Sequence, residues 1–364
     1  MTDLESSSAR LLVVGFHGKS VSPDLRALLD RGVGGVILFS RNVGSAEDVA
    51  ALCADIKHAA ARPLVIAVDQ EGGQVARLRQ GFTPIPSARV IGASDDPSVA
   101  HDVGALIGRE LRAVGVDMDY APVLDVDTNA SNPVIGARAF SRDAARVSAL
   151  GVAFAAGLAS AGVAACGKHF PGHGDTLQDS HHTLPRLPHA LNRLEALELL
   201  PFRAAIAAGV PALMTAHVIF EALDAERPAT MSRRVVRELL RGSMGYQGLV
   251  VSDDIEMRAI ADHFGVEELV THGLEAGVDQ FLCCHTAELA HRAIDSIARG
   301  ARDGTISETS LVEANRRVTE FTARYARTPL VRPELAALRS PAHLELSARL
   351  QAHAEETAAD PTRG

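Results

Sequence analysis

Eight short apolar runs recur along the chain, and they constrain its fold more than any other feature. Most of them are nearly continuous rather than alternating, as in strands that are buried on both faces of a parallel sheet. The runs are Leu11–Phe16, Gly34–Phe39, Leu64–Val68, Val116–Ala121, Val163–Lys168, Ala212–Ala216, Leu249–Ser252 and Val278–Leu282. The sequence therefore predicts eight buried strands.

Stretches with the period of an amphipathic helix lie between these runs. They are Ala46–Ala60, Pro97–Val114, Asp143–Ala161, Asn192–Ala208, Arg233–Met244 and Met257–Ala276. We expect Pro201 to divide the fourth stretch into two helices, because proline lacks the amide hydrogen that a helix interior needs. Glycine stands at six helix-to-strand joints, where C-terminal caps are expected: Gly32, Gly115, Gly162, Gly209, Gly248 and Gly277.

Alternation of strands and helices indicates right-handed crossovers between parallel strands. Eight such units without a second block of strands predict an α/β protein built as a single closed (β/α)8 barrel. An open, doubly wound sheet is the alternative. We expect the barrel to occupy residues 1–327 and a C-terminal extension to occupy residues 328–364, with a helix near Leu344–Ala354 and a frayed end.

The charge of the chain restricts its partners. The net charge is -9 and the 36 Lys and Arg residues are scattered, so the basic patch that binds nucleic acid is missing. Residues 1–9 lack the basic and apolar regions of a signal peptide, and no apolar run approaches the roughly 20 residues of a membrane span. We expect a cytoplasmic protein without nucleic-acid or membrane partners. We also expect a monomer, although no sequence feature decides the oligomeric state.

The densest polar stretch follows the fifth run. Residues 167–185 contain four histidines, two aspartates, one lysine and five Gly or Pro positions. Active sites of barrels lie at the carboxyl ends of the strands, so this loop is a candidate site. Asp179 and His181 are two residues apart, and in a curled chain the carboxylate can orient the imidazole and stabilise its protonated form. The pair is a candidate proton shuttle.

The histidines of this loop also suggest a metal site. His169 and His173 have the i, i+4 spacing of a helical ligand pair. Phe170-Pro171-Gly172 between them breaks a helix and removes the geometry that this spacing needs. The His-Glu-x-x-His context of helical zinc sites is also missing. We therefore expect no metal and no other cofactor.

Two aspartates follow the seventh run directly. Successive side chains of an extended chain point to opposite sides, so only one of Asp253 and Asp254 is expected to face the mouth of the barrel. Aspartate is also a favoured N-cap of helices. We expect Asp254 to cap the following helix and Asp253 to be the functional carboxylate.

One carboxylate and three cations follow other strands: Asp69, Arg77, Arg138 and Lys168. This set suits a ligand with several hydroxyl groups, because a carboxylate accepts hydrogen bonds from hydroxyls while Arg and Lys donate to ring oxygens or acids. For Arg77, a salt bridge that ties loops to the barrel is the alternative.

Together these motifs closely resemble glycoside hydrolase family 3, in its β-N-acetylhexosaminidase branch. The motifs are Lys168–Gly174 with Asp179–His181, Asp69–Gly73, and Ser252–Met257. The resemblance runs from Leu11 to about Tyr325, and the motifs occur in the order of the family.

The resemblance implies a retaining exo-hydrolase that removes terminal β-linked N-acetylglucosamine. It implies that Asp253 is the nucleophile, that His181 is the general acid and base, and that Asp179 holds His181. It also implies the residues that bind the sugar hydroxyls: Asp69, Arg77, Arg138, Lys168 and His169. A His-Asp pair can replace the second carboxyl of most retaining glycosidases, because imidazole titrates near neutral pH.

Several alternatives stay open. The family includes β-glucosidases that take their proton donor from a second domain, which we do not expect here, and enzymes that transfer the sugar to phosphate. The substrate is expected to be a muropeptide, in cytoplasmic recycling of the cell wall, or a chitin-derived oligosaccharide. A catalytically inactive, sugar-binding barrel is the non-enzyme alternative.

Overall fold

A closed barrel of eight parallel strands forms the centre of the protein. The computed structural model describes residues 3–177, 184–330 and 333–359. The strands follow the order β1–β12–β11–β9–β7–β6–β3–β2, and β1 pairs with both β2 and β12. They are β1 (Leu12–Val14), β2 (Gly35–Leu38), β3 (Val65–Val68), β6 (Met118–Asp119), β7 (Ala164–Phe170), β9 (Ala212–Thr215), β11 (Leu249–Asp254) and β12 (Gln280–Cys283). Closure confirms the predicted (β/α)8 barrel and excludes the open sheet.

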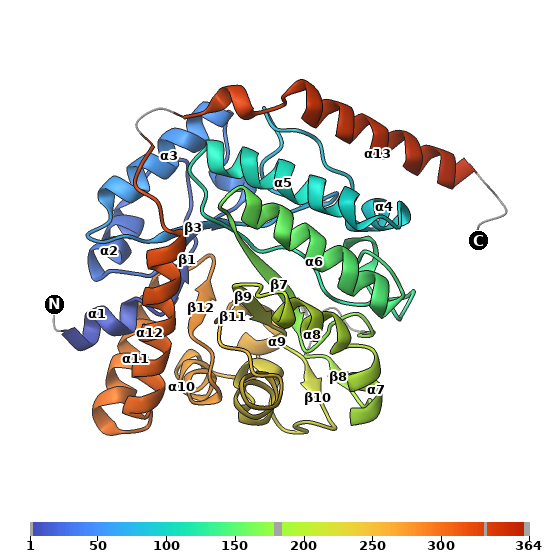
Figure 1. Ribbon diagram of the computed structural model, residues 1–364. Coiled ribbons are helices and arrows are strands. Elements are labelled where there is room, and N and C mark those ends of the chain that lie inside the picture. Colours follow the sequence, from blue (N-terminus) through green and yellow to red (C-terminus); the bar gives the residue numbers. More distant parts are fainter. Residues whose placement is uncertain (1–2, 178–183, 331–332, 360–364) are drawn as a thin grey trace.

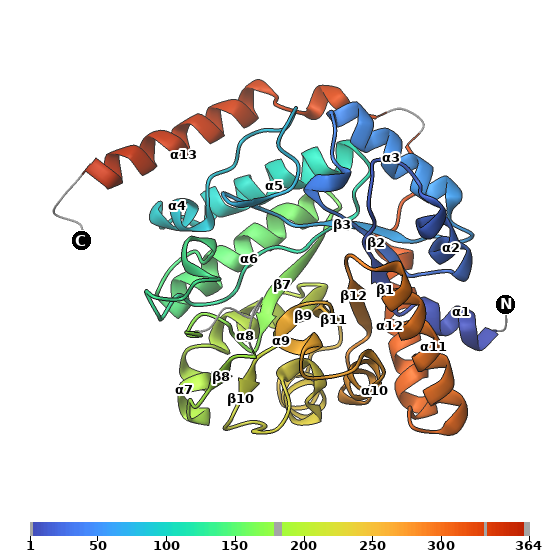
Figure 2. The same cartoon turned by 180° about the vertical axis from the view of Figure 1, so that it is seen from behind.

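Helices surround the barrel (Figures 1 and 2). They are α1 (Asp3–Ala9), α2 (Pro23–Arg31), α3 (Ala46–Ala59), α4 (Ala88–Ala93), α5 (Pro97–Ala113), α6 (Ala144–Ser160), α7 (Leu191–Ala196), α8 (Leu200–Ala207), α9 (Arg258–Ala261), α10 (Val266–Ala276), α11 (Ala287–Asp303), α12 (Glu308–Tyr325) and α13 (Pro341–Ala359). Short 3-10 helices are η1 (Ser40–Asn42), η2 (Gly136–Arg138), η3 (Ala229–Met231) and η5 (Leu335–Ala337), and η4 (Arg234–Ser243) is a π-helix.

Two small sheets lie outside the barrel, and the sequence did not predict them. The strands β4 (Gln70–Gly72) and β5 (Val75–Ala76) form an antiparallel hairpin directly after β3. The strands β8 (Arg186–Leu187) and β10 (Ile219–Phe220) pair in parallel. Segments of two or three residues are too short to show a hydrophobic period.

The helix boundaries test three further predictions. The division of residues 192–208 is confirmed, since α7 and α8 are separate and Pro201 lies in the first turn of α8. The single helix expected over Met257–Ala276 is wrong. The chain forms α9 and α10 there, and Gly265 adopts an extended conformation as the N-cap of α10. The helix expected near Leu344–Ala354 is α13.

The prediction of glycine caps is confirmed at five joints and is wrong at Gly248. The other five glycines have a positive φ, whereas between η4 and β11 it is Gly245 that has one, at 70°. Gly248 instead allows a close approach, because a Cβ there would lie 2.3 Å from the hydroxyl of Tyr246. The absence of a side chain is what this position needs.

The barrel strands are apolar because they face the packed interior on one side and the helices on the other. Every residue of β2, β3, β9 and β12 is buried. Burial of a large aliphatic side chain contributes roughly 1.5–3 kcal/mol to the stability of the fold. These strands therefore form a stable scaffold beneath the loops. In the described part of the chain, no helix combines the length and the apolar character that a membrane crossing requires.

Candidate active site

A cavity of about 380 Å³ opens at the carboxyl ends of the barrel strands. This is the end at which barrels of this type carry their chemistry. Six of the residues singled out in the sequence line it: Asp69, Arg77, Arg138, Lys168, His169 and Asp253. The other two, Asp179 and His181, lie outside the described residues.

The two strands that supply three of these six residues are irregular at the cavity. The pairing of β7 with β9 shifts between Gly167 and Phe170, and the pairing of β11 with β12 shifts between Val251 and Asp254. Such irregularities re-aim side chains at the rim of a sheet. Lys168, His169 and Asp253 all lie within the shifted segments.

Buried ion pairs form one wall of the cavity. Lys168 Nζ donates to Asp69 Oδ1 at 2.8 Å and lies 2.7 Å from Glu71 Oε1. Arg138 donates to both oxygens of Glu71, at 2.9 and 2.7 Å. Lys168 and Glu71 are only 2% and 5% exposed. The four groups form a neutral network of two cations and two carboxylates.

Burial and pairing act in opposite directions on these groups. Burial alone would raise the pKa of Glu71, but Arg138 and Lys168 hold it far below its ordinary value. Burial likewise opposes the charge of Lys168, and Asp69 and Glu71 raise the pKa of its ammonium group. Both side chains are therefore charged, and they offer fixed donors and acceptors to a ligand with hydroxyl groups.

Arg77 makes contacts of two kinds. One guanidinium nitrogen lies 3.5 Å from Asp69 Oδ2, and the group lies over the ring of Phe39 at 5.5 Å from its centroid. Its side chain also lines the cavity and is 28% exposed. The structure is thus compatible with both the loop-tying salt bridge and the ligand contact.

Asp125 organises the end of β7. Its Oδ2 lies 2.7 Å from His169 Nδ1, and its Oδ1 accepts hydrogen bonds from the amides of His169 and His173, at 3.1 and 2.7 Å. Burial would raise the pKa of Asp125, but the imidazoles of His169 and His173 and these hydrogen bonds hold it below its ordinary value. The carboxylate is therefore ionised, and it fixes the orientation of the His169 ring.

Asp253 is an ionised carboxylate at the tip of β11. Its Oδ1 accepts a hydrogen bond from the amide of Asp254 at 2.8 Å. Burial would raise its pKa, but His169, His217 and this amide outweigh burial and lower the pKa. An ionised carboxylate in a cavity that also holds charged donors and acceptors is suited to nucleophilic attack on an electrophilic carbon.

The predicted role of Asp254 as a helix cap is wrong. Met257 occupies the N-cap position of α9, because β11 continues through Asp254 and a turn separates it from the helix. Asp254 Oδ1 instead accepts from the amides of Glu256 and Cys284, at 3.1 and 3.3 Å. Both aspartates line the cavity, so the expectation that only one faces the mouth is also wrong.

The pKa values of the neighbouring aspartates are shifted in opposite directions. Burial, together with the charges of Glu256 and Asp253, raises the pKa of Asp254 to about 7. The pKa of Asp253 is lowered. Adjacent carboxyls with pKa values pushed apart can do different chemistry. The ionised Asp253 can act as a nucleophile, and the protonated form of Asp254 can donate a hydrogen bond near neutral pH.

Sequence reasoning did not assign a function to Glu71, Asp125 or His173. Glu71 and Asp125 lie within four residues of the ends of predicted strands, and this position was the available signal. His173 is 1% exposed, and its Nδ1 lies 2.8 Å from Thr176 Oγ1. Burial and the charge of His169 lower the pKa of His173 to about 4, so its imidazole is neutral at neutral pH.

The histidine pair considered as a metal site lies in a strand and the loop that follows it rather than in a helix. The rings of His169 and His173 are 5.8 Å apart between centroids, and both side chains adjoin Asp125. Across the described ranges, no three His, Cys, Asp or Glu side chains are placed to hold a metal ion.

Asp175 joins the two sides of the segment 178–183, which is not described. Its carboxylate accepts from Thr128 Oγ1 at 2.9 Å, lies 2.5 Å from His189 Nε2, and pairs with Arg193 at 3.1 Å. Thr128 and Asp175 precede the segment, and His189 and Arg193 follow it. Described residues on either side of this segment are therefore tied together.

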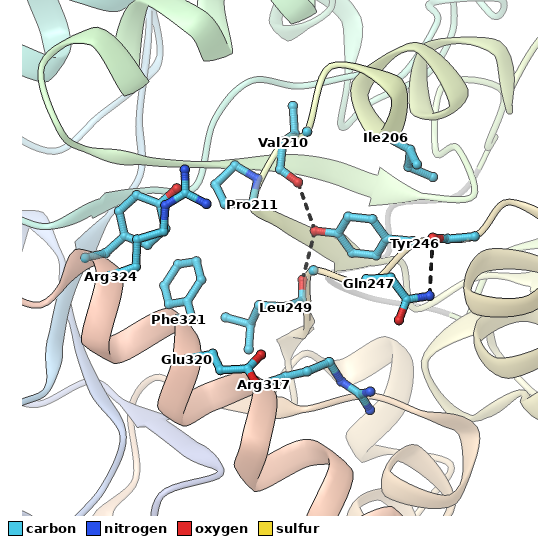
Figure 3. A pocket seen from close by; sticks show the side chains of 14 residues that line it. Ile206, Val210, Pro211, Tyr246, Gln247, Leu249, Arg317, Glu320, Phe321 and Arg324 are labelled. Atoms are coloured by element: carbon cyan, nitrogen blue, oxygen red, sulfur yellow. Dashed lines mark hydrogen bonds between the residues drawn. The ribbon is translucent and has the colours of Figure 1, made fainter.

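A second cavity, of about 350 Å³, lies at the opposite end of the barrel, where β9 and β11 begin (Figure 3). The hydroxyl of Tyr246 lies 3.2 and 3.3 Å from the carbonyl oxygens of Val210 and Leu249. Arg317 donates to Asp279 at 2.8 Å. In this second cavity, Tyr246 and Arg317 thus form their hydrogen bonds within the protein, as expected at the end of a barrel that serves stability.

Comparisons with known proteins agree with this geometry. The profile described as "Glycosyl hydrolase family 3 N terminal domain" matches residues 4–321. The chain is 44% identical over 315 residues to a β-hexosaminidase of Alkalilimnicola ehrlichii, which covers 84% of this chain and 88% of the relative.

Two solved structures show the same fold. A glycoside hydrolase family 3 β-N-acetylglucosaminidase from Paenibacillus sp. is 41% identical with a TM-score of 0.93, over 97% of this chain and 69% of the other. NagZ from Neisseria gonorrhoeae, solved in complex with N-trifluoroacetyl-D-glucosamine, is 32% identical with a TM-score of 0.80, over 94% of this chain and 98% of the other. The chain therefore belongs to glycoside hydrolase family 3, as the family profile, the barrel fold and the relatives all show.

Proposed function

We propose that this protein is a retaining exo-β-N-acetylglucosaminidase. The observation that carries the proposal is the ionised Asp253 in one cavity with the paired groups Lys168, Asp69, Glu71 and Arg138. A retaining glycosidase needs a nucleophilic carboxylate beneath the anomeric carbon and polar groups that hold the sugar ring. Relatives named β-hexosaminidase and β-N-acetylglucosaminidase support the identity of the sugar.

In the proposed mechanism, Asp253 attacks the anomeric carbon while His181 protonates the departing glycosidic oxygen. This step breaks the glycosidic bond and forms a covalent glycosyl-enzyme. His181 then takes a proton from water, which attacks the anomeric carbon and releases Asp253, so the configuration is retained. Asp179 orients His181. The roles of His181 and Asp179 rest on the resemblance of the motif.

The sugar is held by its hydroxyl groups. The residues proposed for this task are Asp69, Arg77, Arg138, Lys168 and His169. Lys168 and Arg138 are fixed by Glu71, and His169 is fixed by Asp125, so these donors are in place before a ligand binds. Groups that are already oriented lose little entropy on binding.

The substrate class that we propose is a glycan with a terminal β-linked N-acetylglucosamine. Muropeptides, in cytoplasmic cell-wall recycling, are one such substrate, and chito-oligosaccharides are the other. Both share the terminal sugar, and they differ in the group beyond the scissile bond. Relative kcat/KM values for an N-acetylglucosaminyl-anhydromuramic acid compound and for chitobiose separate the two.

Hydrolysis of 4-nitrophenyl N-acetyl-β-glucosaminide tests the proposal directly. We expect release of nitrophenol from this glycoside and much slower release from the β-glucoside. Absence of activity together with binding of N-acetylglucosamine would indicate an inactive sugar-binding barrel. Product analysis in phosphate buffer distinguishes hydrolysis from transfer, because a phosphorylase yields the sugar 1-phosphate.

A further inference from the structure

The helix α13, which follows the barrel, has a buried face that contains polar side chains. It runs along the outer side of α5 and packs on α4 (Figures 1 and 2). His343, Ser347 and Leu350 are only 6%, 4% and 4% exposed. Their spacing places them on one side of the helix. Polar groups on a buried face need partners, and these partners identify what the helix holds.

The two polar residues of this face hold the backbone at residues 83 and 84. Ser347 Oγ donates to the carbonyl oxygen of Pro84. His343 Nδ1 lies 3.0 Å from Glu110 Oε1 on α5, and Glu110 Oε2 accepts from the amide of Thr83 at 2.9 Å. The segment that begins at residue 83 is therefore fixed to α13, once directly and once through Glu110.

This segment, residues 83–87, contacts the turn of the hairpin β4–β5. The amide of Gly73 donates to the carbonyl oxygen of Ile85 at 2.9 Å. A Cβ at Gly72 would lie 2.4 Å from the carbonyl oxygen of Pro86, so the two backbones touch without space for a side chain. Glu71, which bridges Lys168 and Arg138, immediately precedes this turn.

The helix α13 also supports Arg138, which forms the ion pair with Glu71. α13 packs on α4, and α4 packs on η2, whose last residue is Arg138. Arg89 of α4 also donates to the carbonyl oxygen of Gly136 on η2 at 3.2 Å. Glu71 and Arg138 thus rest on two segments, residues 83–87 and α4, and α13 contacts both segments.

We propose that α13 is a positioning element of the sugar site. Through His343 and Ser347 it sets the placement of Glu71 relative to Arg138, and with it the affinity for the sugar ring. A bidentate pair of Arg and carboxylate depends strictly on geometry. The identity of the ligand rests on the proposed function, whereas the positioning itself rests on the contacts alone.

The double variant H343A/S347A of the full chain tests the positioning without any sugar. Hydrogen–deuterium exchange is measured on peptides that cover residues 70–76 and 134–138. We expect faster exchange in both, and unchanged exchange in β9 and β11. Glu345→Ala, on the exposed face of the same helix, is the matched control. Unchanged exchange in both peptides of the double variant overturns the proposal. Ser347→Ala alone gives the same comparison if the double variant folds poorly.

Kinetics with 4-nitrophenyl N-acetyl-β-glucosaminide measure the consequence for the sugar. We expect KM to rise about three- to tenfold while kcat stays within about twofold, because Asp253 is carried by β11, outside these contacts. A lower melting temperature with an unchanged KM would mean that α13 only stabilises the fold, and would overturn the proposal. If the wild-type protein cleaves no N-acetylglucosaminide, the proposed function fails, and the exchange experiment still decides the role of α13.

Discussion

His169 Nδ1 lies 2.7 Å from Asp125 Oδ2, and the second oxygen of the same carboxylate accepts hydrogen bonds from two backbone amides. One buried group thus holds both the imidazole and the chain around it. Because Nδ1 is engaged, Nε2 is the ring nitrogen through which His169 can meet a ligand. Asp125 is therefore a positioning residue for a proposed sugar contact.

Replacing Asp125 with Asn should lower kcat/KM for the aryl N-acetylglucosaminide by about 10- to 100-fold, because one of the two buried acceptor oxygens and the charge that orients His169 are lost. Steady-state kinetics and the melting temperature are measured together. Asp117→Asn is a matched control, since Asp117 is fully buried before β6 and pairs with Lys57 at 2.9 Å. That control should lower the melting temperature and leave kcat/KM nearly unchanged. Equal effects of the two variants on kcat/KM would refute a special role of Asp125.

Covalent trapping should label Asp253. Its pKa is held low, whereas that of Asp254 is raised to about 7. A 5-fluoro glycoside of N-acetylglucosamine should therefore accumulate an adduct that peptide mass spectrometry locates at Asp253. Asp253→Asn should abolish labelling and lower kcat by about a thousandfold or more, whereas Asp254→Asn should still be labelled. A label on Asp254 would reverse the assignment.

The proposed general acid predicts a dependence on the leaving group. His181→Ala and Asp179→Ala should slow cleavage of substrates with poor leaving groups by about 100-fold or more, and should affect very acidic phenols least, because these need little protonation. The measurement is a series of aryl N-acetyl-β-glucosaminides with leaving groups of increasing pKa, and a natural disaccharide. Equal losses across the series would show that neither residue supplies the proton.

Asp119 should make stability depend on pH. It is fully buried, Oδ1 accepts from the amide of Gln70 at 2.9 Å, and the described residues provide no partner for Oδ2. Burial, with smaller effects of Asp69 and Glu71, raises the pKa of Asp119 from 3.8 to about 8. Between these two values the folded protein keeps a proton that the unfolded chain has released. Stability should therefore fall as the pH rises through this window.

Replacing Asp119 with Asn removes this titration. Relative to the wild type, the variant should gain stability on the order of 3–4 kcal/mol between pH 5 and pH 8. Urea unfolding at the two pH values measures the difference. Asp55→Asn, at an exposed position of α3, is the control and should leave the pH dependence unchanged. A variant with the pH dependence of the wild type would show that Asp119 does not carry it.

The strands and the location of the cavity were predictable because both follow from local patterns. An apolar run marks each strand, and the carboxyl ends of parallel strands must meet at one end of a barrel. Lys168, His169 and Asp253 could therefore be placed in one cavity, because Lys168 ends such a run and the other two residues directly follow one. The roles proposed for them still rest on the tests described above.

The remaining features depend on contacts that no local pattern records. Glu71 bridges residues that are distant in the sequence, so its ion pairs could not be read from the motif that contains it. Asp254 was expected to be a helix cap because aspartate favours that position, but the strand continues through it. The contact of Ser347 with Pro84 likewise joins the extension to an early loop, and only the folded chain brings the two together.

The pairing of β1 with β12 has a consequence for synthesis. Of the barrel strands, β1 is made first and β12, which closes the barrel, is made last. Until β12 emerges from the ribosome, the sheet has two open edges, β1 and β11, and open edges of apolar strands pair readily with other chains. Truncation before Gln280 should therefore produce a chain that aggregates instead of a smaller folded protein.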